Sequence, residues 1–408
     1  MERPVNILWI VTTQWRAQAT GYAGDVQART PCLNAFAARS VNYSQAVTPH
    51  PFGPFARAAL LTGMPSPENG VANYYDALPV DTRTIAHELA ERSYHTAFFG
   101  KWHLGERDSR VPLVGEAHAK TLIPPERRGG FEFWEGFESG FVLNDPWLHG
   151  SRLPEPRQFA GYQSDVLAER AGDYLASYPR ENAKPWFAVV SLESPHPPYA
   201  ASSAGIIPVD PTILVLPANV PRGSSVEVQA RRELAGYYAH IEATDRAIGR
   251  LIGRIADANT VIVVTSVHGD MHGAHGCFRK GWPYEESVRV PLLVGGPTLL
   301  VGRSGQHDAP VSLTDLRAFT LDWADARCPV LGRTHSLISM PSVVGLPHQC
   351  DRIWRGVRTA KRKLILNADG QTWLFFDLER DPLELENLAH DPARAVEIDQ
   401  LRGLMQSG

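Results

Sequence analysis

The chain has 408 residues, 43% of them hydrophobic and 21% charged, with a formal net charge of -4 at pH 7. This length and composition predict a soluble globular protein with a large buried core, and the small negative charge argues against general binding of nucleic acid. The four cysteines lack the spacing of a disulfide framework or a metal site, so we expect free thiols and a cytoplasmic protein. No segment has the pattern of a signal peptide or a membrane span.

Short apolar segments alternate with amphipathic segments along the chain, which predicts an α/β fold with a mostly parallel sheet flanked by helices. Buried strands are expected at 6–11, 95–99, 186–192, 260–265 and 290–294. Helices are expected at 31–40, 84–92, 226–255 and 313–325. Thr30 and Ser312 are the expected N-caps of the first and last of these helices.

Two regions depart from this alternation. Residues 104–160 are rich in Gly, Pro and Trp and are expected to form surface excursions beside the sheet. After a Pro, Gly and His stretch at 328–350, short alternating segments surround the hairpin signal Asp369-Gly370 and predict a small antiparallel sheet. We therefore expect an α/β domain at 1–327 and a small C-terminal α+β subdomain at 328–408, packed on the first.

Five motifs occur in a characteristic order: NILWIVTTQW at 6–15, RAALLTG at 57–63, GKWHLG at 100–105, SPHPPY at 194–199 and TSVHGDMHGAHGCFRKGWPYEESVRVPLL at 265–293. With the tail segments VRTAKRKLILNADG and DLERDPLELENLA, the chain resembles the sulfatase branch of the alkaline-phosphatase superfamily from end to end. The resemblance implies that family's mixed, mostly parallel sheet flanked by helices, with a small antiparallel sheet at the C-terminus.

The chain departs from the family where the resemblance implies metal ligands and a nucleophile. Thr12 and Thr13 stand in place of two aspartates, Val267 in place of a third, and Gly53 in place of the Cys or Ser that becomes formylglycine. A hard divalent cation prefers anionic oxygen ligands, and glycine has no side chain to modify. We therefore expect neither a metal nor a cofactor, and the family's attack on sulfur lacks an attacking atom.

The positions that surround the sulfate in the family are retained. The resemblance implies that these are Arg57, Lys101, His103, His196, His268 and Lys280, with Thr12, Thr13 and Gly53 beside the bound group. Loss of three aspartates and a divalent cation leaves the pocket about one charge more positive, with no acidic counterion from the motifs. A bound oxyanion would relieve the resulting repulsion.

These observations favour a metal-independent enzyme that expels sulfate by breaking a C–O bond. A neighbouring amine would displace the sulfate and close an aziridine ring, as in natural-product biosynthesis, or loss of a proton would give an alkene. Fixed cations and protonated histidines would stabilise the leaving dianion. The reaction also needs a general base, for which Glu193, Asp270 and His272 are candidates, unless a smaller partner subunit supplies it.

Two alternatives stay open. The chain could be a non-catalytic subunit that binds sulfate or phosphate esters. It could also be a hydrolase with an atypical metal site, because His268, His272 and His275, with Cys277 nearby, offer zinc ligands. The expected partner is a small-molecule sulfate ester in a pocket lined by residues 104–160 and 200–225, and neither nucleic acid nor a membrane is expected as a partner.

Overall fold

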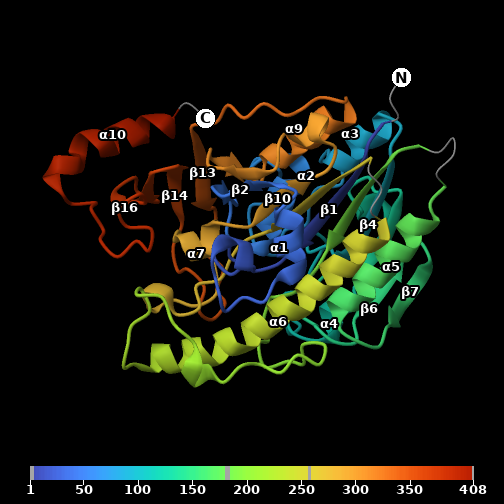
Figure 1. Ribbon diagram of the computed structural model, residues 1–408, viewed down its shortest axis with the longest axis horizontal. Helices are drawn as coiled ribbons and strands as arrows, with labels where there is room; N and C mark the ends of the chain where they lie inside the picture. The colour runs from blue at the N-terminus through green and yellow to red at the C-terminus, as the bar shows by residue number, and fades with distance from the viewer. Residues whose placement is uncertain (1–3, 180–183, 256–258, 407–408) are drawn as a thin grey trace.

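The centre of the protein is a large twisted sheet, seen in the computed structural model, which describes residues 4–179, 184–255 and 259–406 (Figure 1). The strand order is β11-β2-β10-β9-β1-β8-β4-β5-β6-β7. Five neighbouring strands are parallel: β9 (Thr260–Ser266), β1 (Asn6–Thr12), β8 (Trp186–Ser191), β4 (His95–Lys101) and β5 (Phe133–Phe137). The outer strands are β11 (Gly305–His307), β2 (Val41–Tyr43), β10 (Leu292–Gly295), β6 (Trp147–Gly150) and β7 (Leu153–Gln158).

Helices cover both faces of this sheet, which explains why its central strands are apolar along their whole length. Ile7, Trp9 and Val11 of β1 belong to the core beneath one set of helices, α2 (Gly53–Thr62), α3 (Ile85–Glu91) and α9 (Asp315–Ala324). Leu8 and Ile10 belong to the opposite core, beneath α1 (Pro31–Ala37), α5 (Gln163–Ser177) and α6 (Ser225–Ile255). The predicted fold class is confirmed.

Thr30 occupies the N-cap position of α1 as predicted, whereas the N-cap predicted at Ser312 is wrong. The Thr30 hydroxyl makes no capping bond, and Asp245 of α6 instead accepts the first-turn amides of Cys32 (2.9 Å) and Leu33 (2.8 Å). A carboxylate is the stronger acceptor, and it also ties α1 to α6. Helix α9 begins at Asp315, two residues beyond the position that an N-cap at Ser312 implies.

The segment 104–160 contributes more to the sheet than expected. It contains β5, β6 and β7, which extend the sheet beyond β4 through one parallel and two antiparallel pairings. The prediction of surface excursions is therefore wrong for these strands. Their Gly and Pro content hid the alternation that marks a strand.

A second, antiparallel sheet forms the C-terminal part, at the opposite end of Figure 1 from α5 and β7. Its strands are β13 (His335–Met340), β14 (Trp354–Thr359), β15 (Arg362–Asn367) and β16 (Thr372–Asp377), with α10 (Ala395–Leu404) beside it. The Asp369-Gly370 signal correctly predicted a hairpin, in which Gly370 has a φ of 82°. Strand β13 was not predicted. The division at residue 327 stays a prediction.

Several short elements complete the chain. They are β3 (Ala46–Val47), β12 (Val311–Ser312), α4 (Glu116–Ala119), α7 (Glu285–Val288) and α8 (Thr298–Val301), with 3-10 turns at Gly21–Ala23, Pro125–Arg127, Pro211–Ile213, Ala274–Gly276 and Pro392–Arg394. Among the residues that the structure describes, no helix is both long and apolar enough to cross a bilayer.

A buried ion-pair group joins the C-terminal sheet to α7 (Glu285–Val288), the short helix that precedes β10 of the main sheet. Lys363 of β15 contacts Glu285 of α7 at 3.1 Å and also pairs with Glu384, while Arg358 of β14 contacts Glu285 at 2.9 Å. Replacing Lys363 by methionine is expected to lower the free energy of unfolding by about 3–5 kcal/mol, because buried carboxylates lose their partner. Denaturant unfolding measures this, with the exposed Lys361→Met as a control that should change little. Equal stability of both variants would show that the group does not hold the C-terminal sheet to α7.

Candidate active site

The predicted site residues converge at one edge of the main sheet. Strands β1, β4, β8 and β9 are parallel neighbours, so their carboxyl ends lie side by side. The chain leaves these ends through Thr13, Lys101, Glu193 and His268, while Arg57 comes from α2 and Lys280 from the loop after β9. We call Arg57, Lys101, Lys280, His103, His196 and His268 the cationic cluster.

Arg57 is buried at the centre of the cluster, with its side chain held by three acceptors. Its Nη2 donates to Thr13 Oγ1 (2.7 Å), and its Nη1 donates to Ser191 Oγ (2.7 Å) and to the Lys101 carbonyl (3.2 Å). Burial lowers the pKa of Arg57 to about 10, against the opposing effect of Glu193. The guanidinium is therefore cationic at neutral pH. Its Nε is buried and finds no hydrogen-bond partner among the described residues, which leaves one donor for a ligand.

Lys101 has an acidic partner inside the site. Its Nζ donates to Glu193 Oε1 at 2.6 Å, and both side chains are almost completely buried. The motifs were expected to supply no acidic counterion, and Glu193, which lies just before the motif at 194–199, supplies one to Lys101. Burial lowers the pKa of Lys101 to about 8, while Glu193 acts in the opposite direction. The half-buried ring of Phe141 lies 4.7 Å from Lys101 Nζ and stacks on His196.

The three histidines of the cluster are neutral rather than protonated. Burial lowers the pKa values of His103, His196 and His268 well below their usual range, and the nearby lysines lower them further. His196 and His268 each direct Nδ1 at a backbone carbonyl, at 2.7 and 2.9 Å. In these two neutral rings, Nδ1 therefore carries the proton and Nε2 is an unprotonated hydrogen-bond acceptor. The expected contribution of protonated histidines does not hold for this state of the site.

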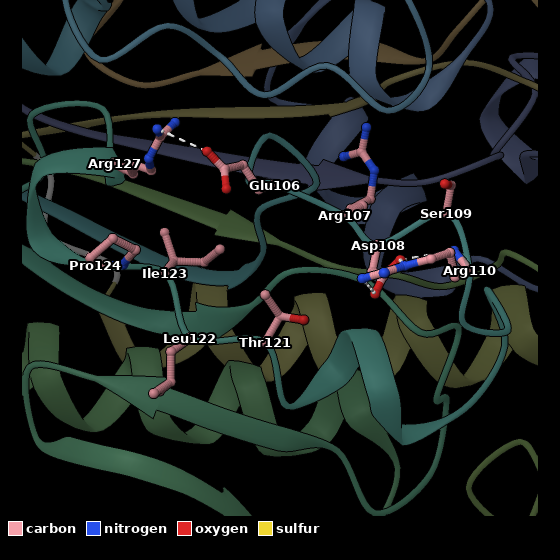
Figure 2. Close-up of a pocket in the computed structure, with 10 residues that line it drawn as sticks. All are labelled: Glu106, Arg107, Asp108, Ser109, Arg110, Thr121, Leu122, Ile123, Pro124 and Arg127. Atoms are coloured by element: carbon pink, nitrogen blue, oxygen red, sulfur yellow. Dashed lines mark hydrogen bonds and ion pairs between the residues drawn. The ribbon is translucent and has the colours of Figure 1, made fainter.

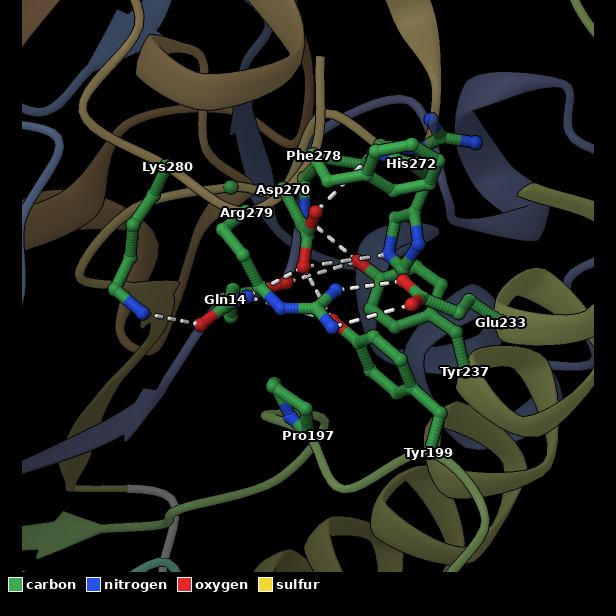
Figure 3. A network of polar contacts seen from close by, with 12 residues as sticks. Gln14, Pro197, Tyr199, Glu233, Tyr237, Asp270, His272, Phe278, Arg279 and Lys280 are labelled. Carbon is green, nitrogen blue, oxygen red and sulfur yellow. Dashed lines mark hydrogen bonds and ion pairs between the residues drawn. The ribbon is translucent and has the colours of Figure 1, made fainter. Parts of the chain in front are cut away.

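Lys280 is held by a residue that the sequence did not single out. Its Nζ donates to Gln14 Oε1 at 2.8 Å (Figure 3). The same Nζ lies 3.3 Å from His196 Nε2. Gln14 follows Thr13 in the first motif, so its position beside the predicted site was the available signal. Asp270 accepts a hydrogen bond from Gln14 Nε2 and is the second carboxylate of the site. The site therefore combines three cationic side chains with two carboxylates.

The residues at the family's metal and nucleophile positions do not fit a divalent cation or formylglycine. The Thr12 hydroxyl donates to the Thr265 carbonyl (3.1 Å). Its place beside a bound sulfate stays a prediction. The Thr13 oxygen accepts from Arg57, the Gln14 oxygen accepts from Lys280, and Val267 is apolar. The Thr13 and Gln14 oxygens thus face cationic donors, where a metal ion would be repelled. A Cβ on Gly53 would lie 2.8 Å from His103 Nδ1, so the present position of His103 requires glycine there.

The proposed histidine metal site is not assembled either. His272 packs against Tyr237, with ring centroids 4.2 Å apart, while His275 stacks on Tyr284. In the described part of the chain, the one group with metal-ligand spacing is His275, Glu286 and Glu384. Each of its members already has a partner, because Asn219 donates to Glu286 Oε1 (2.7 Å) and contacts His275, and Lys363 pairs with Glu384. Glu286 Oε2 has no hydrogen-bond partner among the described residues.

Two cavities flank the cluster and contain residues from the two segments expected to line a substrate pocket. The first, of about 540 Å³, lies between residues 106–110 and 121–127 and is rimmed by the pairs Glu106–Arg127 and Asp108–Arg110 (Figure 2). Arg107 links it to the cluster by donating to the His103 carbonyl (3.0 Å). The second, of about 660 Å³, is lined by Pro197, Tyr199 and Arg279 together with residues 208–211. Their occupancy by substrate stays a prediction.

Comparison with known proteins gives matches over nearly the whole chain. The family model described as Sulfatase matches residues 5–326. An ulvan-active sulfatase of Formosa agariphila is 32% identical over 413 residues, which cover 95% of this chain and 77% of the relative. An arylsulfatase of Clostridium perfringens is 26% identical, covering 98% and 93%. A crystal structure of a candidate sulfatase from Bacteroides fragilis, 23% identical, has a TM-score of 0.85 and covers 100% and 96%.

Proposed function

The chain belongs to the sulfatase family, and on that premise we propose that it binds a sulfate ester and releases sulfate by breaking the C–O bond, without a metal and without attack on sulfur. The relatives are named as sulfatases. The departure from hydrolysis is argued from this chain's own residues. Its site keeps the cations that grip a sulfate, while position 53 has no side chain and the nearby oxygens face Arg57 and Lys280.

One observation carries this function: a buried, net cationic cluster in which several polar atoms are unpartnered among the described residues. These atoms are Arg57 Nε, His268 Nε2 and both ring nitrogens of His103. Buried polar groups are normally hydrogen-bonded, so such a group of atoms around three cations fits a multivalent oxyanion. On binding, the anion would raise the pKa values of the histidines and turn their nitrogens into donors.

Sulfate is a good leaving group, so the site must stabilise charge rather than donate a proton to the leaving oxygen. As the C–O bond breaks, its electron pair leaves with the sulfate, and the second negative charge develops among Arg57, Lys101 and Lys280. These cations are fixed by buried hydrogen bonds before the reaction begins. Preorganised charge of this kind is worth roughly 3–4 kcal/mol for each donor.

Glu193 is the best placed of the three candidate bases. Its Oε1 accepts from Lys101, and its Oε2 is buried without a hydrogen-bond partner among the described residues. Asp270 already accepts from Gln14, Tyr199 and the His272 amide, and burial lowers the pKa of His272 to about 4. Glu193 would take a proton from the substrate nitrogen, whose lone pair forms the new N–C bond as the C–O bond breaks. In the elimination route, it would take the proton from carbon instead.

An isotope experiment tests this function directly. The protein is incubated with a 2-aminoalkyl sulfate in ¹⁸O-water, and the products are analysed by mass spectrometry. We expect inorganic sulfate and an organic product that both lack the label, because neither displacement by nitrogen nor elimination uses water. Label in the sulfate would show attack on sulfur, and label in an alcohol would show attack of water on carbon. Either result would contradict the proposed reaction.

Two further outcomes separate the alternatives. An unchanged ester that binds saturably would favour a non-catalytic ester-binding protein, for which the same cationic cluster suffices. Label in the sulfate together with loss of turnover on adding a chelator would favour a hydrolase with a recruited metal. Elemental analysis of the purified protein gives an independent check, because a stoichiometric divalent metal is not expected. A smaller partner subunit stays a prediction.

A further inference from the structure

Gln14 connects the cationic cluster to a buried carboxylate behind it. The residue leaves β1 in the left-handed region, with a φ of 70°, and its amide lies between Lys280 and Asp270 (Figure 3). Gln14 Oε1 accepts from Lys280 Nζ at 2.8 Å, and Gln14 Nε2 donates to Asp270 Oδ2. All three side chains are buried. Two hydrogen bonds therefore connect the Asp270 carboxylate to the Gln14 amide and the Gln14 amide to the Lys280 ammonium.

Asp270 fixes which way the amide points. Its Oδ2 also accepts from the Tyr199 hydroxyl, and its Oδ1 accepts from the His272 backbone amide at 3.2 Å. A carboxylate can only accept hydrogen bonds, so the NH₂ group of Gln14 must face Asp270 and the carbonyl must face Lys280. The Arg279 guanidinium lies over the Tyr199 ring, 5.5 Å from its centroid, and holds that side of the network.

The same contacts restrict the Lys280 ammonium. One proton is directed at Gln14 Oε1, and a second faces His196 Nε2 at 3.3 Å. Nε2 must be the acceptor, because Nδ1 of that ring serves the Pro197 carbonyl. An ammonium has three protons, so one remains for an oxyanion in the cluster. An amide at position 14 thus orients Lys280 without cancelling its charge.

We propose that Gln14, held by Asp270, is a positioning residue that keeps the Lys280 ammonium aimed at the bound sulfate. This role rests on the proposed function, because it assigns Lys280 to the sulfate group of that site. A carboxylate at position 14 would pair with Lys280 and compete with the sulfate. An apolar residue would leave the ammonium without its acceptor. Glutamine avoids both effects.

Titration of Lys280 provides a readout that a merely structural role would not move. Burial lowers its pKa to about 7; Asp270 and Glu193 raise it, Lys101 and Arg279 lower it, and His196 is in contact. Only the protonated form attracts sulfate. The fall of sulfate affinity with rising pH should therefore steepen by about tenfold per pH unit above the pKa of free Lys280, beyond the slope that the histidines contribute.

The test is titration calorimetry of the full chain with inorganic sulfate between pH 5.5 and 9. Gln14→Leu should lower affinity about tenfold at pH 6 and move the midpoint of the pH dependence downwards. Gln14→Glu should also weaken binding at pH 6 but move the midpoint upwards, because a carboxylate favours the charged lysine. The exposed Gln306→Leu is the matched control and should behave as the parent protein.

Opposite shifts of the midpoint support the positioning role. Identical midpoints in the parent protein and both Gln14 variants would overturn it, whatever the change in thermal stability. If Gln14→Leu fails to fold, the upward shift in Gln14→Glu decides the matter alone. Sulfate binding needs no turnover, so a failed isotope experiment with shifted midpoints would reject the reaction and keep this role. Unlabelled products with unshifted midpoints would support the proposed reaction and reject the positioning role of Gln14.

Discussion

Replacing Arg57 by alanine is expected to reduce sulfate release from an ester by about 10²–10³-fold and to weaken binding of inorganic sulfate about 100-fold. The size follows from the loss of a preorganised charged donor in a buried site, and of charge-assisted hydrogen bonds worth about 1.5–3 kcal/mol each. Arg57 is 4% exposed and donates to Thr13, Ser191 and the Lys101 carbonyl, so alanine leaves these three acceptors without their donor.

Two other variants separate charge from geometry at this position. Arg57→Lys keeps the positive charge but cannot contact Thr13 and Ser191 at the same time, so it should recover binding only in part. Arg152→Ala removes an arginine that pairs with Glu135 away from the cluster, and it should leave sulfate release unchanged. Undiminished release by Arg57→Ala would show that the cationic cluster is not the site of reaction.

The fold was largely predictable because the strongest signals were local. The strands at 6–11 and 260–265 are unbroken apolar segments, and in the structure they become β1 and β9, side by side in the sheet. Neighbouring parallel strands then bring their following residues together, so the motif residues had to meet at one edge. Strand β13 was missed because its segment lies among Pro, Gly and His residues, whose turn preferences hide a short edge strand.

The electrostatics of the site could not be predicted in the same way. The pairing of Glu193 with Lys101 joins residues that are 92 positions apart, and no spacing in the sequence records it. The neutral state of the histidines follows from burial, which depends on the whole fold. The contact of Gln14 with Lys280 joins residues far apart in the chain, and the positive φ of Gln14, 70°, is not marked by its residue type. The motifs therefore indicated which residues form the cluster, while the charges and pairing of these residues could be determined only from the structure.

Replacing Glu193 by glutamine is expected to lower sulfate release by about 10²–10⁴-fold, the range in which a general base contributes. The same change should tighten binding of inorganic sulfate, because it removes a negative charge 2.6 Å from Lys101 Nζ. Removing that charge also lowers the pKa of Lys101 below its present value of about 8, because Glu193 now opposes the effect of burial. The tighter binding should therefore be clear below pH 7 and fade above it.

Opposite changes in binding and in turnover distinguish a base from a residue that only supports the site. If Glu193 only supported the structure of the site, its replacement would reduce both sulfate binding and turnover. The matched control is Glu135→Gln, which alters another fully buried, ion-paired carboxylate. Glu135 lies on β5, which pairs with β4, and its partners are Arg152 and Arg170. That variant should keep both sulfate affinity and release. If Glu193→Gln released sulfate at the parent rate, the proton acceptor would have to be sought outside this cluster, and the partner subunit would become the leading source.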